Sequence, residues 1–260
     1  MLLLLANMDL IKISAVSYLN TYPFVFGLKT SGELDDIDLQ LDIPSVCAEK
    51  LRTFKVDLAL VPVGAIPELD HPIQVADYCI GAEREVRTVL LLSHVPLHEI
   101  REIALDFDSK TSVQLIRVLA GKFWKINPTW RQLGPGEAAK GDGCESLVAI
   151  GDKTFQLAGK FPYVYDLAAE WITHTSLPFV FAVWLSNKSL PEGFLRKFNK
   201  ALEYGILHKQ EIPDFFSNQI PSGIDAISYL ENNISYPFDE RKKEGMALFL
   251  KLMNESEISD

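Results

Sequence analysis

Small polar residues follow several of the apolar runs in this 260-residue chain, at places where a ligand could be held. In an open α/β sheet, ligands bind beyond the carboxyl ends of the strands, where loops meet the N-termini of helices. Hydroxyls, amides and backbone N–H groups at such places can bind carboxylates and hydroxyls. The residues that this rule selects are Ser17, Tyr18, Asn20, Thr21, Thr88, Ser109, Lys110, Thr111, Ser112, Gly151 and Asp152.

The segment Ser109 to Ser112 combines hydroxyls, one lysine and the expected start of a helix. The unpaired N–H groups and the positive dipole end of a helix N-terminus favour a carboxylate or phosphate. The alternative is a plain Ser/Thr helix cap, which needs no ligand. The position of this segment beside the other candidate loops favours binding.

Asn20 and Asp152 also have two interpretations. The amide of Asn20 can donate to a substrate hydroxyl or carboxylate and accept in return, or it can cap a helix. Asp152 follows a buried run and a glycine, so it can contact a ligand hydroxyl or cap a helix expected over residues 153–158.

Several familiar kinds of site are not supported by the sequence. Neither a nucleotide-cradling glycine motif nor a Gly-x-Ser-x-Gly nucleophile elbow is present. The five histidines are separated along the chain, and the three cysteines (Cys47, Cys79 and Cys144) form no Cys-x-x-Cys pair. We therefore expect no metal, no cofactor and no disulfide, with the cysteines as buried thiols. The aromatic-rich stretch from Tyr163 to Trp184 is expected to be core, with one or two residues walling a pocket.

The overall charge limits the partners of the protein. A formal net charge of −10 argues against nucleic acid and acidic lipid as ligands. Any anion must therefore be bound by a local arrangement of hydrogen-bond donors. Met1 to Ala6 lacks the features of a signal peptide, and the apolar stretch Leu177 to Leu185 is too short to span a bilayer. We expect a soluble, cytoplasmic protein that does not enter a membrane, while its oligomeric state stays open.

The elements that must position these residues alternate between apolar runs and amphipathic stretches, which is typical of an α/β fold. We predict helices from Thr21, from a cap at Ser45 to Phe54, over Val113–Ala120 and over Asp166–Thr175, and helices alone from Pro191 onward. The predicted strands are Leu10–Ala15, Ile37–Ile43, Leu58–Val63, Val86–Leu92, Ile103–Leu105, Leu147–Ile150 and Phe179–Leu185.

Two of the apolar runs divide the chain. We interpret Val86–Leu92 and Phe179–Leu185 as crossings between two lobes. Residues 1–92 plus 186–260 then form one lobe with the C-terminal helices, and residues 93–185 form an inserted α/β lobe. Candidate loops from both lobes would face one ligand cleft.

Five segments of the chain together resemble the chorismate dehydratase family of menaquinone biosynthesis. They run from the first strand to the second crossing, and each alone is weakly diagnostic. The segments are Ser17-Tyr18-Leu19-Asn20-Thr21, Val86 to Ser93, Ser109 to Ser112, Ile150-Gly151-Asp152 and Tyr165 to Trp184.

The resemblance implies a two-lobed type II periplasmic-binding-protein-like fold. It also implies the loss of water from chorismate, a small dianion, to give 3-[(1-carboxyvinyl)oxy]benzoate in the futalosine pathway, a hydro-lyase reaction without a cofactor. Asn20 and the hydroxyl of Thr88, where the family usually has serine, are implied as active-site groups. The other selected residues are expected to bind the substrate, because of their positions at the ends of apolar runs. Our hypothesis is that the enolpyruvyl carboxylate of the substrate takes the ring proton while Asn20 and Thr88 orient it and the leaving hydroxyl.

Two other functions compete with this one. The related 1,4-dihydroxy-6-naphthoate synthase shares the fold, but its first loop typically reads Ser-Pro-Cys-Pro-Asn-Asp, which differs from the segment Ser14 to Asn20. A solute-binding protein or sensor would close on a small carboxylate without chemistry. The sequence itself leaves open whether Arg87 or Lys110 contacts the ligand.

Overall fold

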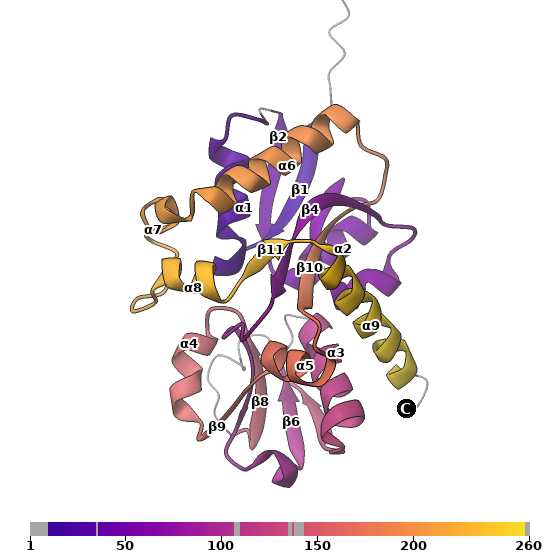
Figure 1. Ribbon diagram of the computed structural model, residues 1–260, viewed down its shortest axis with the longest axis vertical. Coiled ribbons are helices and arrows are strands. Elements are labelled where there is room, and N and C mark those ends of the chain that lie inside the picture. Colours follow the sequence, from indigo (N-terminus) through magenta and orange to yellow (C-terminus); the bar gives the residue numbers. More distant parts are fainter. Residues whose placement is uncertain (1–9, 35, 107–109, 135–136, 138–142, 258–260) are drawn as a thin grey trace, which may run out of the picture.

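The computed structural model describes residues 10–34, 36–106, 110–134, 137 and 143–257. The described part of the chain contains two sheets, one above the other in Figure 1. The first sheet has the strand order β11-β4-β10-β3-β1-β2, with β1 parallel to β2 and β3, and β10 antiparallel to β3 and β4. Its strands are β1 (Ile11–Val16), β2 (Ile37–Asp42), β3 (Leu58–Pro62), β4 (Ile73–Ala82), β10 (Phe179–Ser186) and β11 (Ser235–Pro237).

The second sheet has the order β7-β6-β8-β5-β9. Strand β6 is parallel to β7 and β8, whereas β5 is antiparallel to β8 and β9. The strands are β5 (Val89–Ser93), β6 (Glu102–Leu105), β7 (Thr129–Gln132), β8 (Ser146–Ile150) and β9 (Tyr163–Asp166). We call the parts of the chain built on the two sheets the first and the second lobe.

Sheet membership differs from the predicted lobe boundaries at both crossings. Strand β5 belongs to the second sheet and β10 to the first, so each apolar run is a strand of the lobe that the chain enters. The connections between the sheets are residues 83–88 and the segment that follows α5.

Helices cover both sheets and continue into the C-terminal part of the chain (Figure 1). The helix α9 packs against β10 of the first lobe and α3 of the second, so it lies along both lobes. The helices are α1 (Tyr22–Thr30), α2 (Pro44–Arg52), α3 (Lys110–Val118), α4 (Thr154–Leu157), α5 (Leu167–Thr175), α6 (Glu192–Leu207), α7 (Ile212–Phe215), α8 (Ala226–Asn232) and α9 (Glu240–Glu257).

Alternation along the strands explains the core. In β5, Val89 and Leu91 join the large core that is shared with the first lobe, while Leu90 and Leu92 join a smaller cluster on the other face of the second sheet. This period of two is what a strand buried on both faces requires.

In the first lobe, α1 and α6 touch at Gly27 and Gly205, where an added Cβ would lie 1.9 Å and 1.7 Å from backbone oxygens. The two glycines thereby hold α1, which follows the first candidate loop, tightly in place.

Three local predictions were wrong. Strand β11 returns to the first sheet after Pro191, where we expected helices alone. The helix α2 begins at Pro44 with Ile43 as its cap residue, because proline suits the first helical turn, so Ser45 is not the cap. In the described residues α3 begins at Lys110 rather than at Val113, and it continues as a π-helix over Leu119–Trp124.

Candidate active site between the two lobes

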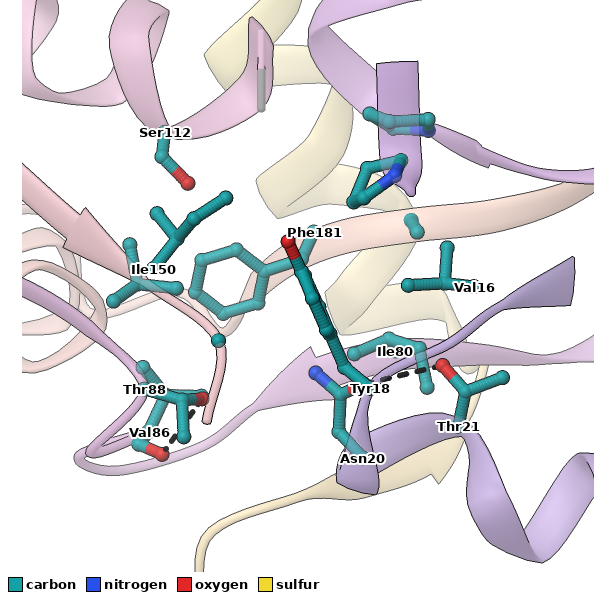
Figure 2. A pocket seen from close by; sticks show the side chains of 15 residues that line it. Val16, Tyr18, Asn20, Thr21, Ile80, Val86, Thr88, Ser112, Ile150 and Phe181 are labelled. Carbon is teal, nitrogen blue, oxygen red and sulfur yellow. Dashed lines mark hydrogen bonds between the residues drawn. The ribbon is translucent and has the colours of Figure 1, made fainter. Parts of the chain in front are cut away.

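A pocket between the two lobes brings together six of the residues that the sequence selected: Tyr18, Asn20, Thr21, Thr88, Ser112 and Gly151 (Figure 2). It contains about 490 Å³ of empty space, its open mouth included. The rest of its lining is apolar or backbone and consists of Val16, Pro44, Pro62, Ile80, Val86, Val89, Ile150, Phe181 and Ala182.

Asn20 is held by its neighbours in a short 3-10 helix, Leu19–Thr21, which begins three residues after the last residue of β1. Its side-chain oxygen accepts from the hydroxyl of Thr21 at 3.1 Å, and its backbone carbonyl accepts from the buried hydroxyl of Tyr236 at 2.9 Å. This leaves the amide nitrogen on the side of Phe181 and Thr88 in Figure 2. Asn20 therefore presents a donor to the pocket in a fixed orientation.

Thr88 lies at the end of the first connection between the lobes and is buried. Its hydroxyl is 2.8 Å from the hydroxyl of Tyr229 and 3.4 Å from the carbonyl oxygen of Val86. Its own carbonyl accepts from the N–H of Gly151 at 2.9 Å. Both ends of this residue are thus anchored, one in each lobe.

Asp166, the cap residue of α5, fixes the connection just before Thr88. Its carboxylate accepts the N–H groups of Val86 at 2.9 Å and Arg87 at 2.6 Å, together with two N–H groups of α5. Burial raises the pKa of Asp166, an effect that these four hydrogen bonds oppose. Arg87 has a left-handed φ of 62°, which points to backbone strain beside the site.

The start of α3 meets the first lobe at Gly64. The hydroxyl of Thr111 accepts from the N–H of Gly64 at 3.0 Å and donates to the carbonyl oxygen of Phe181 at 3.1 Å, so this residue joins the lobes rather than lining the pocket. Ser112 is buried and lines the pocket. Lys110 is half exposed, forms an ion pair with Glu68 at 2.5 Å and lines a different hollow. Ser109 lies outside the described residues.

Asp152 also joins the lobes instead of lining the pocket. Its two carboxylate oxygens lie 3.3 Å and 3.4 Å from the backbone nitrogen of Leu19, which donates to them. Burial raises the pKa of Asp152 to about 6, while this hydrogen bond lowers it. At the neighbouring Gly151, an added Cβ would lie 3.0 Å from the ring of Tyr18, so that ring rests on the glycine. The predicted ligand contact of Asp152 stays a prediction.

Ser17 lies outside the pocket lining, and its N–H donates to the carbonyl oxygen of Asp42 at 2.9 Å. Phe181 is an aromatic wall of the kind expected from the aromatic-rich stretch. The prolines Pro44 and Pro62 and the aliphatic Ile80 were missed, because apolar residues at strand ends carry no chemical signal in a sequence. Position marks only the two prolines, since Pro44 begins α2 and Pro62 ends β3, whereas Ile80 lies within β4.

The lining carries little charge. Among the described residues, it includes no carboxylate, imidazole, ammonium or guanidinium group. The site offers an amide, three aliphatic hydroxyls and a phenol around apolar walls, which suits orienting a ring and excluding water more than abstracting a proton.

The described residues also include no group of three or more side chains fit to hold a metal. The three cysteines are buried thiols, as predicted.

None of the helices in the described residues is long and apolar enough to cross a lipid bilayer.

The fold is that of periplasmic-binding-protein-like molecules. The chain is similar to a solved protein of Archaeoglobus fulgidus, with a TM-score of 0.74, 13% identity, 97% of this chain and 99% of that chain covered. It is also similar to the periplasmic aliphatic sulphonate binding protein of Escherichia coli, with a TM-score of 0.62, 16% identity and 96% and 93% coverage. The predicted two-lobed fold class is therefore confirmed.

The chain belongs to the menaquinone biosynthesis family, whose model matches residues 11–255. It is 27% identical over 240 residues to a chorismate dehydratase of Campylobacter jejuni subsp. jejuni serotype O:23/36 (strain 81-176), a match that covers 90% of this chain and 89% of the relative. The family resemblance noted in the sequence is confirmed.

Proposed function

We propose that the protein is a chorismate dehydratase, a hydro-lyase that removes water from chorismate to give 3-[(1-carboxyvinyl)oxy]benzoate in the futalosine pathway of the cytoplasm. The observation that carries the proposal is the convergence of Asn20 and Thr88 on one pocket that is otherwise largely apolar. The similarity to a chorismate dehydratase over most of the chain supports it.

The proposed reaction breaks the C3–H and C4–O bonds of the ring. The electron pair of the C3–H bond becomes the new ring double bond, the hydroxyl leaves from C4 with a proton as water, and the ring becomes aromatic. The enolpyruvyl carboxylate of the substrate accepts the C3 proton and passes it to the departing hydroxyl, which leaves as water. A lining without a carboxylate or imidazole among the described residues is consistent with a base that the substrate brings itself.

The protein residues orient and stabilise the reacting groups in this scheme. The Asn20 amide nitrogen donates to the enolpyruvyl carboxylate, and the Thr88 hydroxyl donates to the departing hydroxyl. Ser112 and Tyr18 bind the remaining polar groups, while Phe181 and Ile150 enclose the ring. Preorganised donors in a site that excludes water are worth far more than the same groups in water.

The test mixes purified protein with chorismate and follows the product by ultraviolet absorbance and mass. We expect Asn20→Ala and Thr88→Ala each to lower kcat about 100-fold or more, the size measured for removing one such donor elsewhere. Thr88→Ser, which keeps the hydroxyl, should stay within about tenfold of the parent. Lys29→Ala, an exposed change at the end of α1, serves as the control and should leave turnover unchanged.

The structural likeness to a sulphonate binding protein favours one second candidate, a binding protein for a small carboxylate. The same mixture separates the two functions. A binder would raise the melting temperature with chorismate and form no product, whereas full turnover by both alanine variants would contradict the assignment of Asn20 and Thr88.

A further inference from the structure

Tyr229 contacts Thr88, a residue of the pocket lining, although it lies outside the lining itself and far from Thr88 in the sequence. It lies on α8, in the helical C-terminal region of the first lobe, and is buried. Its hydroxyl is 2.8 Å from the hydroxyl of Thr88, and its ring meets the ring of Phe155 of the second lobe edge-on at 5.3 Å between centroids. Tyr229 therefore holds the Thr88 side chain where the two lobes join.

The direction of this hydrogen bond follows from burial. Burial raises the pKa of Tyr229 far above its ordinary value, so the phenol keeps its proton. A buried O–H must donate to an acceptor, and in the described part of the chain the Thr88 oxygen is the partner at hydrogen-bond distance. Tyr229 is then the donor and Thr88 the acceptor.

This direction decides what Thr88 can do with its own proton. With its oxygen accepting from Tyr229, the Thr88 hydroxyl can donate elsewhere, and its other contact is the carbonyl oxygen of Val86 at 3.4 Å (Figure 2). A bond of that length is weak, so a better acceptor in the pocket can replace it at little cost.

We propose that Tyr229 is a positioning residue that sets Thr88 as a hydrogen-bond donor toward the substrate. The inference rests on the proposed function, since it assigns a role within that reaction. By donating to Thr88, Tyr229 uses the threonine oxygen as an acceptor, so the Thr88 proton is not spent on Tyr229 and is left for the hydroxyl that departs from C4. Tyr229 itself lies outside the pocket lining.

The experiment is a double-mutant cycle on chorismate turnover. Tyr229→Phe removes the hydroxyl and keeps the ring, and Thr88→Val removes the other hydroxyl at nearly constant shape. We expect Tyr229→Phe to lower kcat about tenfold with little change in KM, which is the scale of one hydrogen bond. In the Thr88→Val background the same change should have no further effect, whereas in the Thr88→Ser background the loss should reappear.

A structural role of Tyr229 would give a different pattern. Packing damage would lower turnover by the same factor in all three backgrounds and would lower the melting temperature, so equal factors would overturn the inference. Undiminished kcat in Tyr229→Phe would overturn it as well. Turnover by the parent protein tests the proposed function separately from the role of Tyr229. If the parent protein converts chorismate, the proposed function stands whatever the double-mutant cycle shows. If it forms no product, the function and this inference fall together.

Discussion

At the scale of single residues, Asp152 is a carboxylate in an unfavourable environment. It lies beyond the end of β8, and burial raises its pKa to about 6 from an ordinary value of 3.8. One hydrogen bond from the N–H of Leu19 offsets part of the loss of water. A carboxyl group that spans the two lobes in this way links the stability of the whole molecule to pH.

The sign of this linkage follows from the direction of the shift. Between about pH 4 and pH 6 the folded protein holds a proton that the unfolded chain releases, so the free energy of unfolding falls as the pH rises. The full loss, about 2 to 3 kcal/mol, is reached above pH 6. We predict that Asp152→Asn, which keeps an acceptor for Leu19, removes this dependence.

Urea unfolding of both proteins at pH 4.5, 5.5 and 7.5 measures the effect. The free energy of unfolding of Asp152→Asn relative to the parent should grow across this range. Any cost of burying the amide group is the same at each pH, so it changes the difference in unfolding free energy by a constant and does not make that difference depend on pH. A difference that stays constant with pH would contradict the prediction.

Which site residues the sequence could predict depended on their chemistry. Asn20, Thr88 and Ser112, which line the pocket, could be selected because polar side chains at the ends of apolar runs are rare enough to notice. Tyr229 was missed, since its hydroxyl reaches Thr88 across 141 positions of sequence and nothing in the amphipathic pattern of α8 marks it. Lys110 was selected for its charge, yet in the structure it forms an ion pair with Glu68.

At the scale of elements, the start of α3 and the segment after β3 form a close backbone contact between the lobes. A Cβ on Gly64 would lie 2.8 Å from the Cα of Thr111 and 2.9 Å from its backbone nitrogen. Backbone atoms cannot rotate away as a side chain does, so Gly64 is needed for α3 to bring Ser112 to the pocket.

We predict that Gly64→Ala weakens ligand binding more than it weakens folding. The added methyl group forces α3 away from the first lobe, which moves Ser112 and breaks the hydrogen bond to Thr111. The Kd for chorismate, measured by calorimetry, should rise about tenfold or more, the cost of losing one or two hydrogen bonds. Gly159→Ala is the matched control, because its Cβ would meet nothing within 4 Å. An unchanged Kd for Gly64→Ala would contradict this account of the contact.

The elements also show where sequence patterns fail. The strands β1, β3 and β8 were predicted closely, because runs buried on both faces read as continuous apolar segments. Strand β4 was missed, since it begins with exposed residues and includes Asp77 and Gly81. The three residues of β11 are too few to show a period, and their pairing with β4 comes from the tertiary structure.

At the scale of the whole molecule, two lobes meet around a pocket whose described lining carries no charged side chain. The chain as a whole has a formal net charge of −10. The ligand in the proposed function is a dianion, so long-range forces oppose its approach and short-range donors must hold it after arrival. The sequence predicted that an acidic protein would bind an anion through local donors, since its composition is acidic while its candidate loops are rich in hydroxyls.

We predict that the turnover of chorismate becomes more efficient as salt is added. Screening shortens the range of the repulsion to about 10 Å at 0.1 M ionic strength, so the association rate should rise. Between about 20 and 200 mM salt, kcat/KM should increase about two- to fivefold while kcat stays nearly constant, because buried hydrogen bonds respond weakly to ions. Repeating the titration with potassium chloride and potassium acetate separates screening from competition by a particular anion. A fall of kcat/KM with both salts would instead mean that a local positive field, and not uncharged donors, attracts the substrate.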